Sequence, residues 1–334
     1  MTLQLLEICA GAGGQAVGLE MAGFQHAAAI DLDPAACSTL RMNRPSWDVI
    51  ESDVRCVDGT TWRGVDLLAG GVPCPPFSIA SKQLGADDER DLFPEALRLV
   101  QEVKPKAVML ENVRGLATIK FAPYRRNLVA RLEQLGYQTA WRVLNACDYG
   151  VPQLRPRFVL VGLRQPYASF FLWPEPRPAG QTVGEVLGDL MGERGWGGAA
   201  HWQQRANRIA PTLVGGSKKH GGPDLGPTRA RRQWAELGVD GLGLADAPPP
   251  PDFLIDGNPR LTLRMVARLQ GFPDSWQFTG KKTTAYRQIG NAFPPPVAQA
   301  VGAAVHCALL CKSISEEHPG QLRLFEPNLP ALAL

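Results

Sequence analysis

The sequence predicts an α/β protein in which helices cover a largely parallel sheet, with a smaller, loop-rich unit inserted before the C-terminal helix. Over residues 1–164, short apolar runs alternate with helical patterns, as expected for strands linked by crossover helices. A glycine-rich turn follows the first apolar run, and residues 174–260 are rich in glycine and proline. The length of 334 residues fits two domains, or one domain with an insertion, at about 100–200 residues per domain.

The individual elements follow in chain order. A helix that begins at Pro34 is expected to be capped by Asp33, because proline suits the first helical turn and the aspartate oxygen accepts from its free amides. Within residues 174–260 no long periodic element is expected, and four consecutive prolines mark a break. Strands are expected at residues 3–9, 26–30, 65–69, 107–110 and 158–163, and helices at 15–21, 92–103, 128–135, 261–269 and 297–310.

Composition excludes several classes of protein. Hydrophobic residues make up 45% of the chain and charged residues 20%, which excludes a mostly disordered protein. The seven cysteines form no CxxC pair, so we expect no zinc site, and free thiols in a reducing cytoplasm are the simplest interpretation. No apolar run approaches the roughly 18 residues of a membrane span. The net charge of +3, taken alone, argues against strong nucleic-acid binding.

The glycine turn is the first candidate binding feature. Gly11, Gly13 and Gly14 let a ligand approach backbone amides at a helix N-terminus, although a tight turn also needs glycine for steric reasons alone. Asp31 follows about twenty residues later, at the end of the second strand, where a carboxylate can bind ribose hydroxyls. Asp53 is expected in the same cleft. Together they favour a nucleoside-containing cofactor, either a nicotinamide dinucleotide or S-adenosylmethionine.

Cys74 is a candidate nucleophile. It stands between Pro73 and Pro75, which exclude helix and fix the local backbone. The segment follows a strand, at the sheet edge where open α/β folds bind ligands. A thiol held rigidly at this place can act as a nucleophile, and the alternative is a small buried apolar residue.

A carboxylate and two arginines follow further along the chain. Glu111 comes directly after the apolar run at residues 107–110, so it is expected at the same sheet edge as Cys74. In an extended segment Gln153, Arg155 and Arg157 point to one side, and their donors suit a carbonyl, a carboxylate or a phosphate. The alternatives are a turn cap for Glu111 and a solvated sheet edge for the other three.

In this order, these features resemble the motifs of the DNA cytosine-5 methyltransferase family. The resemblance spans nearly the whole chain except residues 175–255, and such an ordered series favours the functional interpretations above over their alternatives. It implies a Rossmann-like, S-adenosylmethionine-dependent catalytic domain at residues 1–174 and 286–334, with a target-recognition domain at residues 175–285. The matching segments run from Glu7 to Gly14, Pro73 to Ser78, Glu111 to Val113, Gln153 to Arg157, Arg260 to Pro273 and Gln288 to Pro295.

The resemblance implies a catalytic role for four residues. Cys74 is expected to add to C6 of a flipped-out cytosine, which activates C5 for methyl transfer. Glu111 is expected to hold N3 and the exocyclic amine, which requires a carboxyl group with a raised pKa. Arg157 is expected to bind O2, with Arg155 supporting the pocket. The residues from Ser78 onward are expected to close over the base, and no side chain is identified as the acceptor of the C5 proton.

The resemblance also implies a set of cofactor-binding residues. The chain departs from the family pattern at Cys9, where an aromatic residue is common, and at Asp31 and Leu32, where a glutamate and an aromatic residue are more usual. The change at Cys9 removes a contact with adenine, and all these departures keep the chemistry feasible. The implied residues are Cys9, Ala10, Gly11, Gly13, Gly14, Asp31, Leu32, Asp53, Val54, Pro73, Leu92, Asn291 and Ala292.

Positive charge is concentrated in one part of the chain. Residues 201–235 hold seven basic residues and one acid, a net charge of +6, which leaves about −3 for the rest of the chain. Flexible, basic backbone suits phosphate contacts, so we expect double-stranded DNA as the partner. The expected DNA-binding residues are Ser78, Gln153, Thr212, Leu213, Lys218, Lys219, Arg229, Arg231 and Arg232.

The leading hypothesis is therefore a site-specific DNA methyltransferase of the bacterial restriction–modification type. We expect a cytoplasmic monomer whose functional counterpart is a cognate restriction endonuclease. The alternatives are the branch of the family that acts on tRNA, a non-catalytic DNA-binding or cofactor-sensing module, and a nicotinamide oxidoreductase. The basic insert argues for duplex DNA, and the set of Cys74, Glu111 and Arg157 argues for catalysis.

Overall fold

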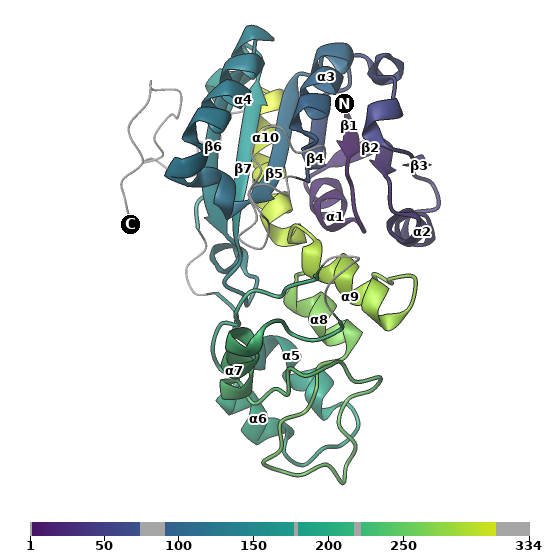
Figure 1. Cartoon of the computed structure of the whole chain (residues 1–334), viewed down its shortest axis with the longest axis vertical. Helices are drawn as coiled ribbons and strands as arrows, with labels where there is room; N and C mark the ends of the chain where they lie inside the picture. Colours follow the sequence, from purple (N-terminus) through teal and green to yellow (C-terminus); the bar gives the residue numbers. More distant parts are fainter. Residues whose placement is uncertain (1, 74–90, 177–179, 217–221, 312–334) are drawn as a thin grey trace.

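The computed structural model describes residues 2–73, 91–176, 180–216 and 222–311, and it has two lobes. In Figure 1 the larger lobe, at the top, is a sheet with helices on both faces, and the smaller lobe below it is mainly helical. The α/β fold class predicted from the sequence is confirmed. No helix in the described ranges is long and apolar enough to cross a membrane.

One seven-stranded sheet forms the larger lobe, with the strand order β3-β2-β1-β4-β5-β7-β6. The first five strands along the chain pair in parallel, as predicted, but β7 is antiparallel to both of its neighbours. The strands β3 and β6 were not predicted from the sequence. The strands are β1 (Leu3–Ile8), β2 (Phe24–Asp31), β3 (Val49–Glu51), β4 (Leu67–Gly71), β5 (Ala107–Val113), β6 (Gln138–Asn145) and β7 (Pro156–Leu163).

Helices cover both faces of the sheet because its central strands are apolar on both sides. Neighbouring Leu5 and Leu6 are completely buried in two different core clusters, one on each face. The cluster with Leu5 contains α10 (Pro295–Leu309) and part of α1 (Gly14–Met21). The cluster with Leu6 contains α3 (Phe93–Val103) and α4 (Ala122–Gln134). Continuous apolar strands of this kind are typical of sheets buried between helices.

The helix predicted to begin at Pro34 is α2 (Pro34–Asn43), and its predicted cap is confirmed. The Asp33 side chain accepts a hydrogen bond from the Ala35 amide at 3.0 Å. At the start of α1 no side chain caps the helix, and Gly13 takes the left-handed conformation instead, with φ 95°. The sequence therefore encodes the two helix starts by different means, one with a side chain and one with glycine.

The smaller lobe contains more regular structure than the sequence suggested. Contrary to the expectation of no long element, α5 (Val183–Gly192) and α7 (Thr228–Glu236) lie there, with the short α6 (Ala199–Arg205) between them along the chain. A capping box of Thr182 and Glu185 starts α5, a sequence signature that was overlooked. Buried Trp202 and Trp234 fill the lobe, so aromatic packing stabilises helices too short to show a clear period.

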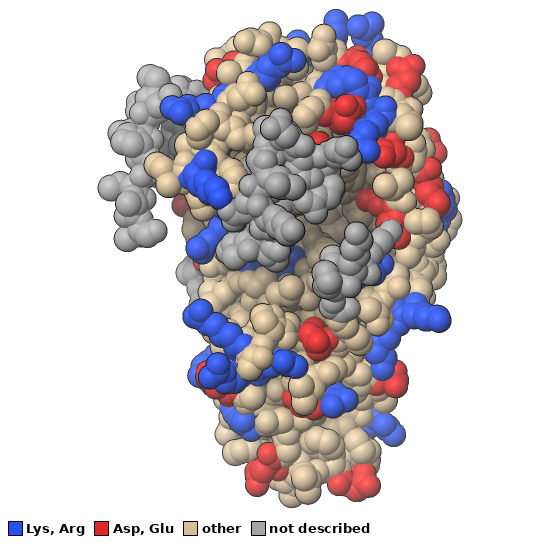
Figure 2. Space-filling view, in the orientation of Figure 1, with Lys and Arg blue, Asp and Glu red and all other residues tan. Residues whose placement is uncertain are grey.

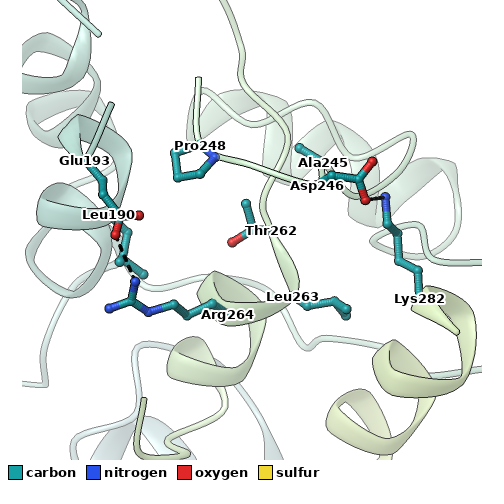
Figure 3. A pocket seen from close by; sticks show the side chains of 9 residues that line it. All are labelled: Leu190, Glu193, Ala245, Asp246, Pro248, Thr262, Leu263, Arg264 and Lys282. Carbon is teal, nitrogen blue, oxygen red and sulfur yellow. Dashed lines mark hydrogen bonds and ion pairs between the residues drawn. The ribbon is translucent and has the colours of Figure 1, made fainter. Parts of the chain in front are cut away.

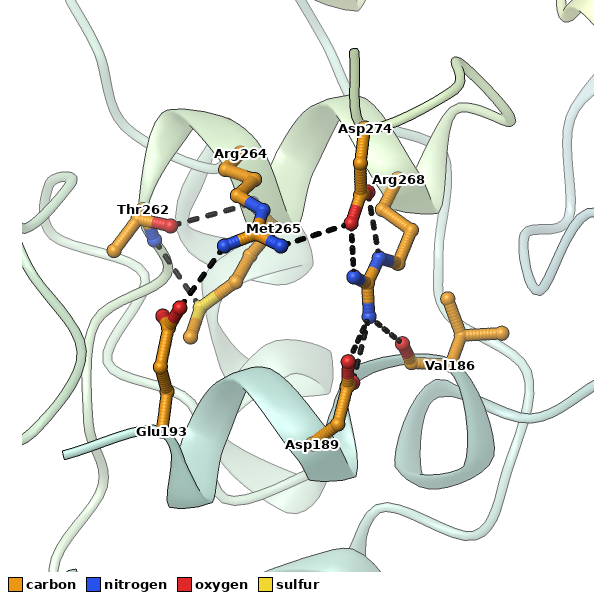
Figure 4. Close-up of polar contacts among 8 residues, drawn as sticks. All are labelled: Val186, Asp189, Glu193, Thr262, Arg264, Met265, Arg268 and Asp274. Atoms are coloured by element: carbon orange, nitrogen blue, oxygen red, sulfur yellow. Dashed lines mark hydrogen bonds and ion pairs between the residues drawn. The ribbon is translucent and has the colours of Figure 1, made fainter. Parts of the chain in front are cut away.

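The two lobes share a continuous core through α8 (Leu263–Leu269) and α9 (Lys282–Asn291). Figure 4 shows Arg268 of α8 between Asp189 of α5 and Asp274, which follows α8. Its guanidinium bonds both carboxylates, with distances of 2.6 Å to Asp189 Oδ1 and 2.8 Å to Asp274 Oδ1. Arg264 bonds Asp274 as well, at 3.0 Å, and the two arginines lower the pKa of Asp274 to about 2. These ion pairs hold α5, α8 and the segment after α8 together.

Candidate functional site

The candidate residues meet at the carboxyl ends of the central strands. The glycine turn follows β1, the segment leading to Cys74 follows β4, and Glu111 lies in β5. Register pairs Ile8 with Gly70, and Gly71 with Glu111, so the three segments are direct neighbours. Asn112 Nδ2 also donates to the Val72 carbonyl at 2.8 Å and fixes the backbone two residues before Cys74. Cys74 itself and Ser78 lie outside the described residues.

The conformation of the glycine turn has both steric and polar causes. A Cβ on Gly14 would lie 2.3 Å from the Phe293 carbonyl oxygen, so the steric reason for glycine applies there. A Cβ on Gly11 would meet nothing within 4 Å, but its φ of 55° favours glycine. Asp31 holds the turn from β2: its carboxylate accepts from the Gly11 amide at 2.7 Å and from the Asp33 amide at 2.7 Å. The turn and the end of β2 thus form one rigid cleft edge.

The predicted cofactor residues gather around this edge to different degrees. Leu32, next to Asp31, is 64% exposed. Val54 is buried, and it begins the short 3-10 turn that Asp53 caps. Pro73 and Leu92 bracket residues 74–90, and the Leu92 amide donates to the Pro73 carbonyl at 3.4 Å. Asn291 and Ala292 arrive from α9, and the Ala292 methyl group packs where a Gly14 Cβ would stand, at 2.9 Å.

This end of the cleft is acidic. Burial raises the pKa of the Cys9 thiol, and the nearby carboxylates of Asp31, Asp53 and Glu7 raise it further. Such a field favours a cation over an anion. S-adenosylmethionine carries a sulfonium and an ammonium and no phosphate, so the charges present here fit that molecule better than a pyrophosphate-containing dinucleotide.

Glu111 and Arg157 form a buried ion pair. Arg157 Nε lies 2.9 Å from Glu111 Oε1, and the two side chains are only 13% and 12% exposed. The antiparallel pairing of β5 and β7 brings them together, because Val113 stands opposite Arg157. Burial raises the pKa of Glu111, while Arg157 and Arg155 oppose that rise. A buried carboxyl beside a guanidinium can present both a hydrogen-bond donor and a cation to a planar polar ligand.

Gln153 and Arg155 are buried, so they do not form the solvated sheet edge that was the alternative interpretation. Gln153 is fully buried and bonds Leu269, Gln270 and the Leu213 amide instead of facing solvent. Arg155 is 1% exposed, and its guanidinium donates to the carbonyls of Leu213, Gly290 and Ala292 at 2.7–2.9 Å. Both side chains therefore join the two lobes, because they belong to the segment between β6 and β7, which contacts the smaller lobe. Direct DNA contact by Gln153 would require these bonds to break.

The expected DNA-binding residues divide into buried and exposed groups. Leu213 is 1% exposed, and Thr212 Oγ1 donates to the Leu154 carbonyl, so both fix the lobe junction. Arg229 and Arg232 on α7 are exposed and Arg231 is half-buried. Lys218 and Lys219 lie outside the described residues. Figure 2 shows lysine and arginine gathered over the part of the smaller lobe where α7 lies.

Two described arginines of the positive segment donate to backbone carbonyls of α7. Arg205 donates to the Ala235 carbonyl at 2.7 Å and Arg208 to the Glu236 carbonyl at 2.9 Å. Both carbonyls belong to the last turn of α7, where cations are favourable. Both side chains remain exposed, so their charge still adds to this surface.

A pocket in the smaller lobe does not belong to this cleft. Figure 3 shows it between α5, residues 245–248 and the first turns of α8 and α9. Its volume is about 210 Å³, and two ion pairs border it: Arg264 with Glu193 at 3.0 Å, and Lys282 with Asp246 at 2.5 Å. Because these lining charges already pair with each other, we assign the pocket no role in the chemistry.

Two residues of the cleft were missed from the sequence. Asn112 lies in an apolar strand, and a buried amide in such a place usually makes a specific hydrogen bond. Gln15 is the only polar side chain in the first turn of α1 and is 3% exposed. For both residues, the sequence feature that could have identified them is an amide side chain within a mainly apolar segment.

The sequence of this chain matches one protein family and several known relatives. A family model described as C-5 cytosine-specific DNA methylase matches residues 3–240 and 245–307. Type II methyltransferase M.NaeI of Lentzea aerocolonigenes is 60% identical over 312 residues, which cover 92% of this chain and 76% of the relative. Type II methyltransferase M.NgoMIV of Neisseria gonorrhoeae is 56% identical over 313 residues, which cover 92% and 99%.

Solved structures share the fold at low sequence identity. The Entamoeba histolytica methyltransferase EhMeth superposes with a TM-score of 0.64 at 16% identity, covering 93% of this chain and 98% of that one. A Spodoptera frugiperda DNMT2 mutant gives a TM-score of 0.60 at 16% identity, covering 92% and 99%. At these identities the likeness supports the arrangement of the elements.

Proposed function

The chain belongs to the C-5 cytosine-specific DNA methylase family, and from that premise we propose that it methylates C5 of a specific cytosine in double-stranded DNA. The observation that carries the proposal is the buried Glu111–Arg157 pair, one strand away from the backbone that leads to Cys74. This pair can bind the polar edge of a cytosine, while the thiol attacks its ring.

The proposed chemistry follows from what these groups can do. Cys74 adds as a thiolate to C6: its electron pair forms the S–C6 bond, and the π pair of the C5=C6 bond is released to C5 and N3. Glu111 in its protonated form donates to N3 and so stabilises the charge that develops there; its raised pKa supports this role. Arg157 donates to O2 of the base. S-adenosylmethionine, when bound, supplies an electrophilic methyl group at C5. Loss of the C5 proton to a base, with water as one candidate, then expels the Cys74 thiolate.

Target recognition is proposed for residues 175–285, with residues 1–174 and 286–334 as the catalytic part. The base must leave the duplex to reach a buried carboxyl, so we propose that it flips into the cleft. Arg229, Arg231 and Arg232 of α7 are the described candidates for DNA contact, together with Lys218 and Lys219. The junction made by Gln153, Arg155 and Leu213 then connects recognition with the base pocket.

The biological setting is proposed from the named relatives. Both are Type II methyltransferases at 56–60% identity. We propose that this chain likewise modifies DNA as part of a restriction–modification system and protects it from a cognate endonuclease. We further propose that it acts as a monomer in the cytoplasm.

Methyl transfer from labelled S-adenosylmethionine tests the proposal. We expect label to enter unmethylated duplex DNA and not tRNA, and bisulfite sequencing to map one methylated cytosine within a short site. The Cys74→Ala variant should bind DNA without transfer, and DNA with 5-fluorocytosine should trap the unaltered protein covalently. Label found in tRNA alone would support the other branch of the family, and absence of any transfer would refute the proposal.

A further inference from the structure

Gln15 occupies an unusual place for a glutamine. It is the second residue of α1, it is 3% exposed, and its helical neighbours Ala16, Val17 and Leu19 are apolar and buried. Its amide nitrogen and oxygen are both buried, with no hydrogen-bond partner among the residues that the structure describes. A buried amide without a hydrogen-bond partner is less stable than a paired one, because its desolvation is not compensated. A leucine or methionine would stabilise this position better, so the amide calls for a functional explanation.

The amide lies at the centre of the cleft. A Cβ built on Gly71, the last residue of β4, would stand 3.3 Å from Glu111 Oε2, 3.8 Å from the Cys9 carbonyl oxygen and 4.0 Å from Gln15 Oε1. Three oxygens from three different segments therefore surround one point. Gly71 has no side chain to fill that point. The chain leads from Gly71, at the end of β4, to Cys74.

Oxygens around a point favour a hydrogen-bond donor, and the acidic surroundings favour a cation. The carboxylates of Asp31 and Asp53 act on this end of the cleft, as their effect on the pKa of Cys9 shows. The proposed cofactor carries two cations. Its ammonium has three N–H donors, whereas its sulfonium has none, so the ammonium matches carbonyl and amide oxygens better.

We propose that Gln15 is a cofactor-binding residue whose amide oxygen, together with the Cys9 carbonyl, accepts hydrogen bonds from the ammonium at the amino-acid end of S-adenosylmethionine. This inference rests on the proposed function. It gives the glutamine a partner in the bound state and explains why an apolar helix retains it. It also places the amino-acid end beside the glycine turn, so that the rest of the molecule extends toward Asp31 and the exposed Leu32.

Binding measurements on the full chain test this role without relying on turnover. S-adenosylhomocysteine keeps the ammonium and lacks the sulfonium, and 5′-methylthioadenosine lacks the amino-acid end altogether. For Gln15→Met, calorimetry should show about tenfold to hundredfold weaker binding of S-adenosylhomocysteine, as expected for a hydrogen bond to a charged group. Binding of 5′-methylthioadenosine should stay within about twofold of the unaltered protein, the scatter expected for a site left untouched.

Thermal stability separates this role from a structural one. Without ligand, Gln15→Met should melt higher than the unaltered protein because it removes an unpaired buried amide. Gln288→Met is the matched control: that buried amide accepts from Thr39 Oγ1 at 2.7 Å and donates to the Thr279 carbonyl at 2.9 Å. It should melt lower and bind S-adenosylhomocysteine normally. Gln15→Leu provides a second apolar variant.

The outcomes divide clearly. Unchanged affinity of Gln15→Met and Gln15→Leu for S-adenosylhomocysteine would refute the inference and leave the proposed function standing. Equal weakening of both ligands would also refute it, because the ammonium would not be the group recognised. If the unaltered protein bound S-adenosylhomocysteine not at all, the proposed cofactor itself would be wrong, and the inference with it.

Discussion

Arg155 offers the sharpest test of how the two lobes are joined. Its guanidinium is buried and donates to Leu213 in the smaller lobe and to Gly290 and Ala292 at the end of α9. The variant Arg155→Met keeps most of the side-chain volume and removes every donor. The Leu213 and Gly290 carbonyls then lose these hydrogen bonds, whereas Ala292 still accepts one from Gln270 at 2.6 Å.

The expected loss follows from these carbonyls. Each buried acceptor left without its donor costs about 1–3 kcal/mol, and part of that is offset because burying the guanidinium also carried a penalty. Burial is strong enough to lower the pKa of Arg155 well below its usual value. We therefore expect Arg155→Met to lose about 2–4 kcal/mol of unfolding free energy, or on the order of 5–10 °C in Tm. Arg155→Lys should not restore the loss, because one ammonium cannot span both sets of carbonyls.

Urea unfolding followed by fluorescence measures this loss, and an exposed arginine provides the control. Arg205 also makes two hydrogen bonds, to Asn258 and Ala235, but at the surface. Arg205→Met should cost less than about 1 kcal/mol. If Arg155→Met were no less stable than Arg205→Met, the buried guanidinium would not be what holds the lobes together, and the reasoning would fail.

Three further predictions concern packing and pH. A Cβ on Gly290 would lie 2.5 Å from the Gly215 backbone, so Gly290→Ala should lose at least about 1–3 kcal/mol of unfolding free energy. A Cβ on Gly197 would meet nothing within 4 Å, so Gly197→Ala should be nearly neutral. Equal effects of the two variants in denaturant unfolding would contradict this. The pKa of Asp274 is lowered to about 2, so its contribution to stability is present above its unfolded pKa of about 3.8 and is lost as pH falls through about 2. Asp274→Asn should therefore lose stability at neutral pH and much less near pH 2, and a deficit independent of pH would argue against the ion pairs. Burial raises the pKa of Glu7, so its contribution is greatest below about pH 4.5 and is lost as pH rises through the raised pKa. Glu7→Gln should thus gain stability relative to the unaltered protein as pH rises, and a constant difference between the two would exclude this account.

Local chemistry made the glycine turn and its surroundings predictable. Gly13 starts α1 through a positive φ, and Asp33 caps α2 through its own oxygen. Both depend on a few consecutive residues, which the sequence displays directly. The position of Glu111 at the sheet edge was predictable for the same reason, because parallel strands end on one side.

The less predictable features depend on residues far apart in the chain. Nothing near β7 in the sequence shows that it runs antiparallel to β5, yet this pairing brings Arg157 to Glu111. The helices α5 and α7 were missed because aromatic packing across the lobe stabilises them more than their own period does. The burial of Gln153 and Arg155 was not predictable, because local alternation gives the side to which a side chain points and not what packs against that side.

By itself, then, the sequence determined the α/β class, the glycine turn, the capped second helix and the series of motifs that point to the DNA cytosine-5 methyltransferase family. Only the tertiary structure decided that Arg155 joins the lobes, that Arg205 and Arg208 bond carbonyls in the last turn of α7, and that oxygens of Gln15 and Glu111 both lie within 4.0 Å of the place of a Gly71 Cβ. The physical reason is that burial and hydrogen-bond partners are properties of the whole packed chain. The sequence gives a side chain's charge and donors, whereas the groups that bond them come from segments up to 264 residues away.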